Sequence, residues 1–75
     1  MLHIQKHFGQ ILKEQREKAG FSQEELAFEA GCNRTFISML ERGLRQPTLT
    51  TLLKLGKALK MPAYLLVQLV EQEIY

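Results

Sequence analysis

Residues 31–43 read "GCNRTFISMLERG", and this stretch decides the fold. Asn33 is a residue type that accepts a backbone N–H at the start of a helix, and Gly43 is the type that ends one. The helix between them carries an arginine and a threonine in its first turn, where a helix that only packs in a bundle needs neither. The pattern therefore predicts a short helix from Asn33 to about Glu41 or Arg42, whose first turn faces a partner.

A second helix precedes this one. Ser22 can begin it, because Glu25 follows three residues later and completes a capping box, and Gly31 can end it. Only Gly31, Cys32 and Asn33 connect the two helices, so they must cross steeply instead of lying antiparallel. Small or apolar residues occupy the positions that would meet at the crossing: Leu26, Ala27, Ala30, Cys32, Ile37 and Leu40. Residues 23–42 therefore have the spacing of a helix-turn-helix.

The rest of the chain predicts three more helices. Apolar side chains recur at three- and four-residue intervals over residues 5–18, and Gly20 follows as a helix end. Thr48 is a natural N-cap for a fourth helix, and Pro62 fits the first position of a fifth, which continues to about Glu73. We expect the fourth helix to bury one stripe: Leu49, Leu52, Leu53, Gly56 and Leu59. The fold class is all-α, with one domain over residues 1–75.

Composition excludes several classes of protein. The 75 residues carry a net charge of +2, and no apolar run reaches the roughly 18 residues of a membrane span. Charged residues begin at Lys6 and recur throughout, so nothing resembles a signal peptide, and we expect a cytoplasmic location. Cys32 has no disulfide partner, and His3 and His7 are too few to hold a metal. With no nucleophile and base at catalytic spacing and no phosphate loop, we expect no enzyme, no cofactor and no small-molecule ligand.

Residues 8–60 resemble the phage repressor and Cro type of helix-turn-helix domain, the XRE-like family. The similarity is clearest in "SQEELA" (22–27) and "FISMLERG" (36–43). It implies a five-helix, lambda-repressor-like domain that binds double-stranded DNA as a two-fold homodimer, to repress or activate transcription. The stretch "NRTFISMLERG" (33–43) is also similar to restriction-modification controller proteins.

The third helix is expected to lie in a major groove with its N-terminal residues toward the bases. Its outward residues Arg34, Thr35, Ser38 and Met39 are the predicted base readers. Arg34 can bridge O6 and N7 of guanine, which discriminates by about 1–3 kcal/mol, or it can hold a phosphate instead. Thr35 can contact a base or a thymine methyl, whereas Ser38 is short and suits a phosphate or a water. Met39 can touch a thymine methyl, but it stands where family members often have a long polar residue.

Phosphate contacts are expected on both sides of this helix. Gln23, at the start of the second helix, resembles the phosphate-clamping glutamine of the family. Arg42, Arg45 and Gln46 follow the third helix and should meet the DNA backbone. Lysines 54, 57 and 60 are interpreted as solvated side chains.

Arg16 and Glu41 occupy the family positions of a buried or half-buried ion pair between the first helix and the end of the third. The resemblance therefore assigns them a structural role in orienting these helices, and neither is expected to read a base. Phe28 and Phe36 are interpreted as packing residues and not as platforms for stacking nucleotides.

The fifth helix, residues 62–74, carries more apolar residues than one core contact needs. They spread over roughly 200° of its circumference, about twice the usual stripe. Either this helix wraps the other four, or a second copy of the chain covers it. We expect a dimer interface of Leu55, Tyr64, Leu65, Leu66, Leu69 and Val70. The alternative function is a protein-interaction module, such as an antitoxin-like partner, that uses this helix to bind a different protein.

Overall fold

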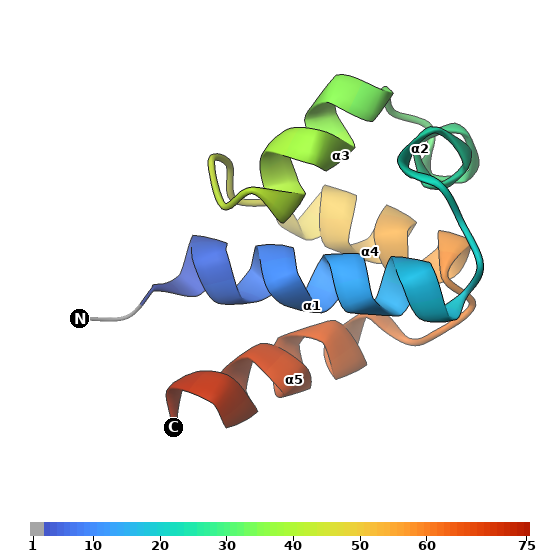
Figure 1. Ribbon diagram of the computed structural model, residues 1–75. Coiled ribbons are helices and arrows are strands. Elements are labelled where there is room, and N and C mark those ends of the chain that lie inside the picture. The colour runs from blue at the N-terminus through green and yellow to red at the C-terminus, as the bar shows by residue number, and fades with distance from the viewer. Residues whose placement is uncertain (1–2) are drawn as a thin grey trace.

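The computed structural model describes residues 3–75, and this part of the chain is helical without strands. Its elements, in chain order, are α1 (Ile4–Lys18), α2 (Gln23–Ala30), α3 (Arg34–Glu41), α4 (Leu49–Ala58) and α5 (Ala63–Ile74) (Figure 1). All five predicted helices are present, and the all-α fold class is confirmed. Pro62, predicted as the first residue of the fifth helix, is its N-cap instead. Met1 and Leu2, which the predicted domain includes, lie outside the described residues.

Side-chain caps fix where three of the helices begin. Ser22 Oγ accepts the N–H of Glu25 at 3.0 Å, while Glu25 Oε1 accepts the N–H of Ser22 at 2.8 Å. Asn33 Oδ1 and Thr48 Oγ1 each accept the N–H three residues later, at 2.8 Å and 3.1 Å. These bonds satisfy N–H groups that have no partner inside a helix, and they are the caps that the sequence predicts.

Four helices end in one motif, in which the N–H groups of the next two residues turn back to carbonyls of the last turn. The motif needs a residue with positive φ. Glycine supplies it after α1, α2 and α3, with φ of 79°, 72° and 74°. After α4 the position belongs to Lys60, with φ of 58°. A side chain with a Cβ is strained in this region, so the turn into α5 forms at an energetic cost that the other turns avoid.

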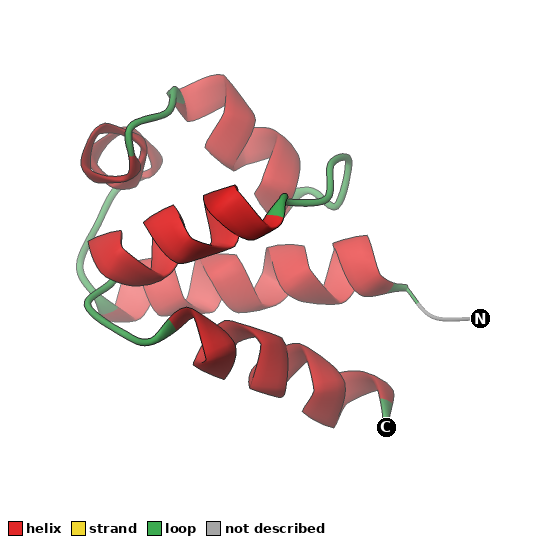
Figure 2. Cartoon of the chain, turned by 180° about the vertical axis from the view of Figure 1, so that it is seen from behind, coloured by secondary structure: helices red, strands yellow, loops and turns green. Residues whose placement is uncertain are grey.

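The helices enclose a single core. In Figure 1, α1 crosses the molecule with α3 above it and α5 below it, and Figure 2 shows α4 from behind. Helix α1 packs on α3 and α5, α2 packs on α3 and α4, and α4 packs on α5. The buried apolar residues are Phe8, Ile11, Leu12, Leu26, Ala27, Ala30, Ile37, Leu40, Leu55, Leu59, Leu66 and Val70. None of the helices within residues 3–75 has the length and apolar content that crossing a bilayer requires.

Gly9 lets α1 touch the backbone of α3. A Cβ at this position would lie 2.5 Å from Leu40 O and 2.6 Å from Glu41 O. Contacts this short do not occur, so only glycine fits here. The distance between α1 and the last turn of α3 is therefore set by main-chain contact.

The buried face of α4 differs from the predicted stripe. Gly56 and Leu59 are buried as expected, but Leu49 and Leu53 are 72% and 58% exposed. Leu55 is fully buried instead. Because α4 packs on α2 with one side and on α5 with the other, its inward arc is centred on residues 55, 56 and 59.

Three residues predicted for the dimer interface belong to the core of the protomer: Leu55, Leu66 and Val70. A second copy cannot touch side chains that the protomer itself covers, so the prediction is wrong for these three. Tyr64 is 70% exposed and Val67 is 44% exposed, while Leu65 and Leu69 are half-buried. Helix α5 thus wraps the core and still leaves an apolar face uncovered, and whether a second copy covers that face stays a prediction.

Candidate nucleic-acid interface

The turn between α2 and α3 gives the third helix its direction. Gly31 adopts φ 72° and ψ 34°, a left-handed conformation that allows the chain to reverse sharply. On the inner side of the crossing, Ile37 and Leu40 are fully buried against the core, and Cys32 is half-buried. Burial raises the pKa of the Cys32 thiol above its ordinary value, although nearby Lys54 opposes this shift, so the thiol is protonated at neutral pH. One side of α3 is therefore anchored, and the other side is available to a partner.

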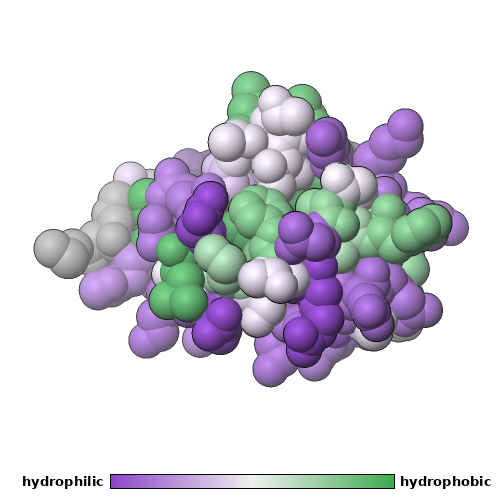
Figure 3. All heavy atoms as spheres, turned by 90° about the horizontal axis from the view of Figure 1, so that it is seen from above, coloured by the Kyte–Doolittle hydropathy of each residue, from purple (hydrophilic) through white to green (hydrophobic). Residues whose placement is uncertain are grey.

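The predicted base readers divide into two pairs. Arg34 and Thr35, the first two residues of α3, are exposed. Ser38 and Met39, one turn later, are half-buried. On the face seen in Figure 3, from above α2 and α3, apolar side chains lie among hydrophilic ones. The end of α3 that points away from the core therefore presents a guanidinium and a hydroxyl, which are groups that hydrogen-bond to base edges or phosphates.

The segment after α3 presents the expected cations and amide. Arg42, Arg45 and Gln46 are all exposed. The Arg42 Nε–H lies 3.4 Å from the carbonyl oxygen of Ser38, a long contact that leaves the guanidinium accessible. These side chains lie within one short segment, beside the C-terminal end of α3.

The beginning of α1 joins this surface, which the sequence reading missed. His3 and Lys6 line a shallow hollow together with Gly43 and Gln46. A Cβ on Gly43 would lie 3.1 Å from Lys6 Cα, so the segment after α3 packs on α1 at this point. One signal was present in the sequence, because Lys6 shares a helical face with Gly9, three residues on. Lys6 thus adds a cation beside Gly43 and Gln46, in the segment that follows α3.

The ion pair that the resemblance implied is present. Arg16 Nε donates to Glu41 Oε2 at 2.6 Å, and Arg16 Nη2 donates to Glu41 Oε1 at 3.1 Å. The two side chains are only 11% and 4% exposed. Hydrogen bonding to Glu41 is the largest influence on Arg16 and raises the pKa of its guanidinium, although burial opposes this. The pair joins α1 to the end of α3 by a charged, two-pronged contact.

Gln23 is tied into the same network. Its Nε2 donates to Glu41 Oε1 at 2.9 Å, and the side chain is half-buried. The sequence predicts that the Gln23 amide contacts a phosphate, and nothing in its spacing indicates a bond to Glu41. The structure therefore brings Gln23 together with the ion pair, at the edge between α2 and α3.

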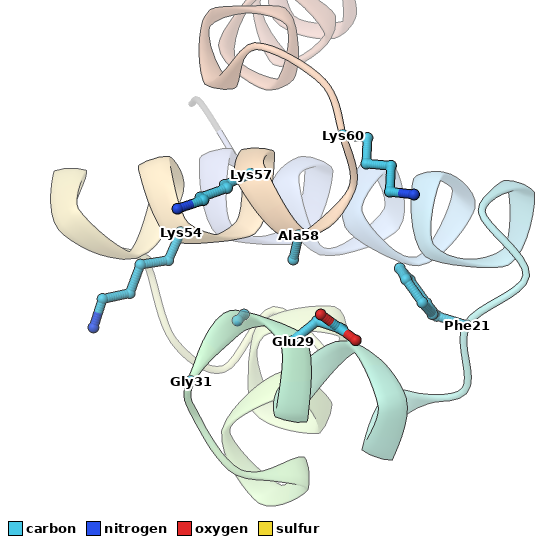
Figure 4. A pocket seen from close by; sticks show the side chains of 8 residues that line it. Phe21, Glu29, Gly31, Lys54, Lys57, Ala58 and Lys60 are labelled. Atoms are coloured by element: carbon cyan, nitrogen blue, oxygen red, sulfur yellow. The ribbon is translucent and has the colours of Figure 1, made fainter.

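A second hollow, of about 610 Å³, lies between the C-terminal end of α2 and α4. In Figure 4, Lys54, Lys57 and Lys60 extend from the α4 side, and Glu29 and Gly31 form the opposite side. All three lysines are exposed. The hollow is separate from the first turn of α3. That the three lysines remain solvated and do not bind DNA stays a prediction.

Phe28 corrects one prediction. It was interpreted as a packing residue, but its side chain is 84% exposed on α2. Phe36, by contrast, is half-buried and packs against the core. Phe28 lies on the exposed side of α2 with Glu24 and Glu25, so its apolar side chain gains little burial there.

The sequence is similar to those of known regulatory proteins. The control protein C.BamHI of Bacillus amyloliquefaciens is 47% identical over 53 residues, covering 69% of this chain and 65% of that protein, so the chain spans slightly less than two thirds of its length. An uncharacterized HTH-type transcriptional regulator of Sinorhizobium fredii, y4dJ, is 36% identical over 58 residues, covering 77% of this chain and 75% of that protein.

Solved structures show the same similarity. The restriction-modification controller protein C.AhdI from Aeromonas hydrophila superposes with a TM-score of 0.81 at 42% identity, covering 83% of this chain and 90% of that chain. Residues 12–66 match the helix-turn-helix family. These matches confirm the resemblance to helix-turn-helix regulators, including restriction-modification controllers. The chain belongs to the helix-turn-helix family.

Proposed function

We propose that two copies of this chain bind a pseudo-palindromic DNA site, each with α3 in a major groove, and thereby regulate transcription. The observation that carries the proposal is the exposed pair Arg34 and Thr35 at the start of a helix whose other side is locked into the core. The family is one of transcriptional regulators and not of enzymes.

Within this proposal the first turn of α3 reads sequence. Arg34 is long enough to bridge guanine O6 and N7, and Thr35 can contact the next base through its hydroxyl or methyl group. Ser38 and Met39 are half-buried, so we assign them contacts only where the groove comes closest to the protein. Titration of Arg34→Ala against single-base variants of the site distinguishes a base contact from a phosphate contact.

Phosphate contacts frame the reading helix. Arg42, Arg45 and Gln46 are exposed on one side of it, and we assign them to the DNA backbone together with Gln23. Lys6 lies beside the same segment and is added to this group. Such contacts fix the position of α3 on the duplex, but they carry no sequence information themselves.

The dimer follows from the uncovered face of α5. Tyr64 and Val67 are exposed, and Leu65 and Leu69 are half-buried beside them. A second copy that packs on this face would cover apolar area that water now contacts. Two recognition helices about 34 Å apart would then enter successive turns of the major groove, and two half-sites together can specify a site that one cannot.

The test is selection of bound sequences from random duplex DNA. The proposal predicts a pseudo-palindrome whose half-sites are separated by about one helical turn, 10–10.5 bp. A selected pool without symmetry would reject the dimer, and a pool with no enriched sequence would reject sequence-specific binding. We further propose a restriction-modification controller, for which the selected site should occur beside restriction-modification genes in the source genome. The cytoplasmic location stays a prediction.

A second candidate is a protein-interaction module, such as an antitoxin-like partner, because the exposed α5 side chains Tyr64 and Val67 also suit a different protein. The two candidates differ in solution. A stable self-dimer in the absence of any partner favours the regulator, since the face would then already be covered. A chain that stays monomeric at every concentration of a dilution series, and also in the presence of DNA, would favour the module.

A further inference from the structure

We propose that Glu41 is a positioning residue for DNA binding: held by Arg16, it fixes the Gln23 amide at the edge of the recognition surface. The inference rests on the proposed function and adds a role to a pair that otherwise only joins α1 to α3. Its basis is one shared oxygen. Glu41 Oε1 accepts from Arg16 Nη2 at 3.1 Å and from Gln23 Nε2 at 2.9 Å.

The carboxylate is held by hydrogen bonds at both of its oxygens. Its other oxygen, Oε2, accepts from Arg16 Nε at 2.6 Å, so both oxygens are engaged by one guanidinium. The guanidinium is fixed in turn, because Arg16 Nη1 donates to the carbonyl oxygen of Phe21 at 2.8 Å. With side chains 11% and 4% exposed, water competes little for these bonds. Glu41 therefore offers Gln23 an acceptor whose position is determined by α1, by the segment before α2 and by α3.

Gln23 retains the means to hold a phosphate in this position. An amide nitrogen carries two hydrogens, and the bond to Glu41 uses one of them. The second hydrogen is available to a phosphate oxygen. A glutamine that is free in solution must lose rotamer freedom when it binds, which weakens binding by about 2- to 10-fold per side chain, and a glutamine already held by Glu41 has lost most of that freedom.

A purely structural pair would behave differently. If Arg16 and Glu41 only held α1 against α3, their replacement would lower stability, yet each folded molecule would still bind DNA through an unaltered Gln23. If Glu41 positions Gln23, the effects of removing the pair and of removing Gln23 must overlap, because both remove the same contact.

The experiment combines three variants of the full chain with a duplex of the selected sequence in which single phosphates are replaced by neutral methylphosphonates. Arg16→Met with Glu41→Leu replaces the buried pair by apolar side chains of similar size, an exchange that folded proteins commonly tolerate. Gln23→Ala removes the amide, and the third variant carries all three changes. Glu14→Leu with Lys18→Met is the matched control, since it removes one acid and one base from exposed positions of α1.

For the wild-type chain, neutralising one particular phosphate in each half-site should lower the affinity for the duplex, because that phosphate is contacted by Gln23. We expect that sensitivity to vanish in Gln23→Ala and to fall markedly in the pair variant, with affinity lower by about 2- to 10-fold in each. The triple variant should bind no more weakly than Gln23→Ala. The control should match the wild type, and sensitivity at the phosphates assigned to Arg45 should persist throughout.

The positioning role is overturned if the pair variant keeps the sensitivity, or if the losses from Gln23→Ala and the pair variant multiply. Should the pair variant not fold, as judged by circular dichroism, Glu41→Gln is the second variant. Its amide carries an NH2 donor where the carboxylate has its second oxygen, so it cannot accept from Arg16 Nε and from the two donors at Oε1 together, and the same sensitivity should fall. A wild-type chain that does not distinguish selected from scrambled duplex would instead reject the proposed function.

Discussion

Lys60 is a single residue whose backbone conformation is strained. Its φ of 58° belongs to a region that glycine enters without strain and that costs other residues about 1–2 kcal/mol. Lys60→Gly should relieve this strain, partly offset by the greater freedom of glycine in the unfolded chain, for a net gain of about 0.5–1 kcal/mol in unfolding free energy. Urea denaturation measures it.

The matched control is Lys57→Gly. It removes the same charge and introduces the same residue, but at a helical position, where glycine should destabilise by about 1 kcal/mol. If Lys60→Gly lowered stability as much as Lys57→Gly does, the strain assigned to the turn before α5 would be absent.

Arg34 and Arg45 carry the same charge but are assigned different tasks. Arg34→Ala should relax preference at one base pair per half-site, by about 1–3 kcal/mol between the right and wrong base. Arg45→Ala should weaken binding to every duplex alike. Anisotropy titrations of each variant against the selected site and its single-base variants distinguish these outcomes. Equal losses on all duplexes for both variants would remove the base-reading role of Arg34.

At the scale of elements, the contact between α1 and α3 depends on Gly9. Alanine is intrinsically better than glycine in a helix by about 1 kcal/mol, so propensity alone predicts that Gly9→Ala stabilises. The added Cβ would lie 2.5 Å from Leu40 O, and separating the helices should cost about 1–3 kcal/mol instead. The thermal midpoint should therefore fall, whereas Gln10→Ala on the exposed side of α1 should leave it unchanged or raise it.

The capping box of α2 should appear as a pH dependence. Hydrogen bonds from Ser22, the backbone N–H first, lower the pKa of Glu25 below its ordinary value of 4.5. A carboxylate whose pKa is lower in the folded state stabilises fully above the unfolded value, and this contribution disappears as the pH falls through the folded value. Wild type should therefore exceed Glu25→Gln in urea midpoint at pH 7, and the difference should shrink below about pH 4.5. A difference that is constant with pH would contradict this.

The same scale shows what the sequence could foretell. The caps at Ser22, Asn33 and Thr48 and the turn at Gly31 are local, because each depends on a few adjacent residues, and all were predicted. The buried face of α4 was not, because leucines cover more of that helix than the core can accept. Which of them are buried depends on where α2 and α5 pack, and that is decided by the whole chain.

In the candidate interface, too, local features were predicted from the sequence and long-range contacts were not. Exposure of Arg34 follows from helical periodicity and was predicted. The bond from Gln23 to Glu41 joins positions 18 residues apart, and the place of Lys6 beside Gly43 depends on the tertiary path of the chain. Neither could be obtained from spacing, because many arrangements of five helices satisfy the same pattern.

For the whole molecule, the proposed dimer sets how binding responds to salt. If each copy neutralises about three or four phosphates, log K against log salt should fall with a slope on the order of −5 to −7. Val67→Glu places a charge on the exposed face of α5 and should yield a folded monomer, since Val67 is 44% exposed in the protomer. That variant should show about half the slope and much weaker binding. A slope near zero for the wild type would reject the electrostatic contribution, and an unchanged slope for Val67→Glu would reject dimerisation through α5.

The main-chain contact between α1 and the last turn of α3 has a consequence for how such a protein can change. Helix α3 is anchored by its last turn and by its buried side. The exposed side chains of its first turn therefore do not hold the fold together. Under the proposed function, new residues at positions 34 and 35 would therefore redirect the protein to other nucleotide sequences while the interior stays as it is. A change of target would then require only a few exchanges in the first turn of this helix.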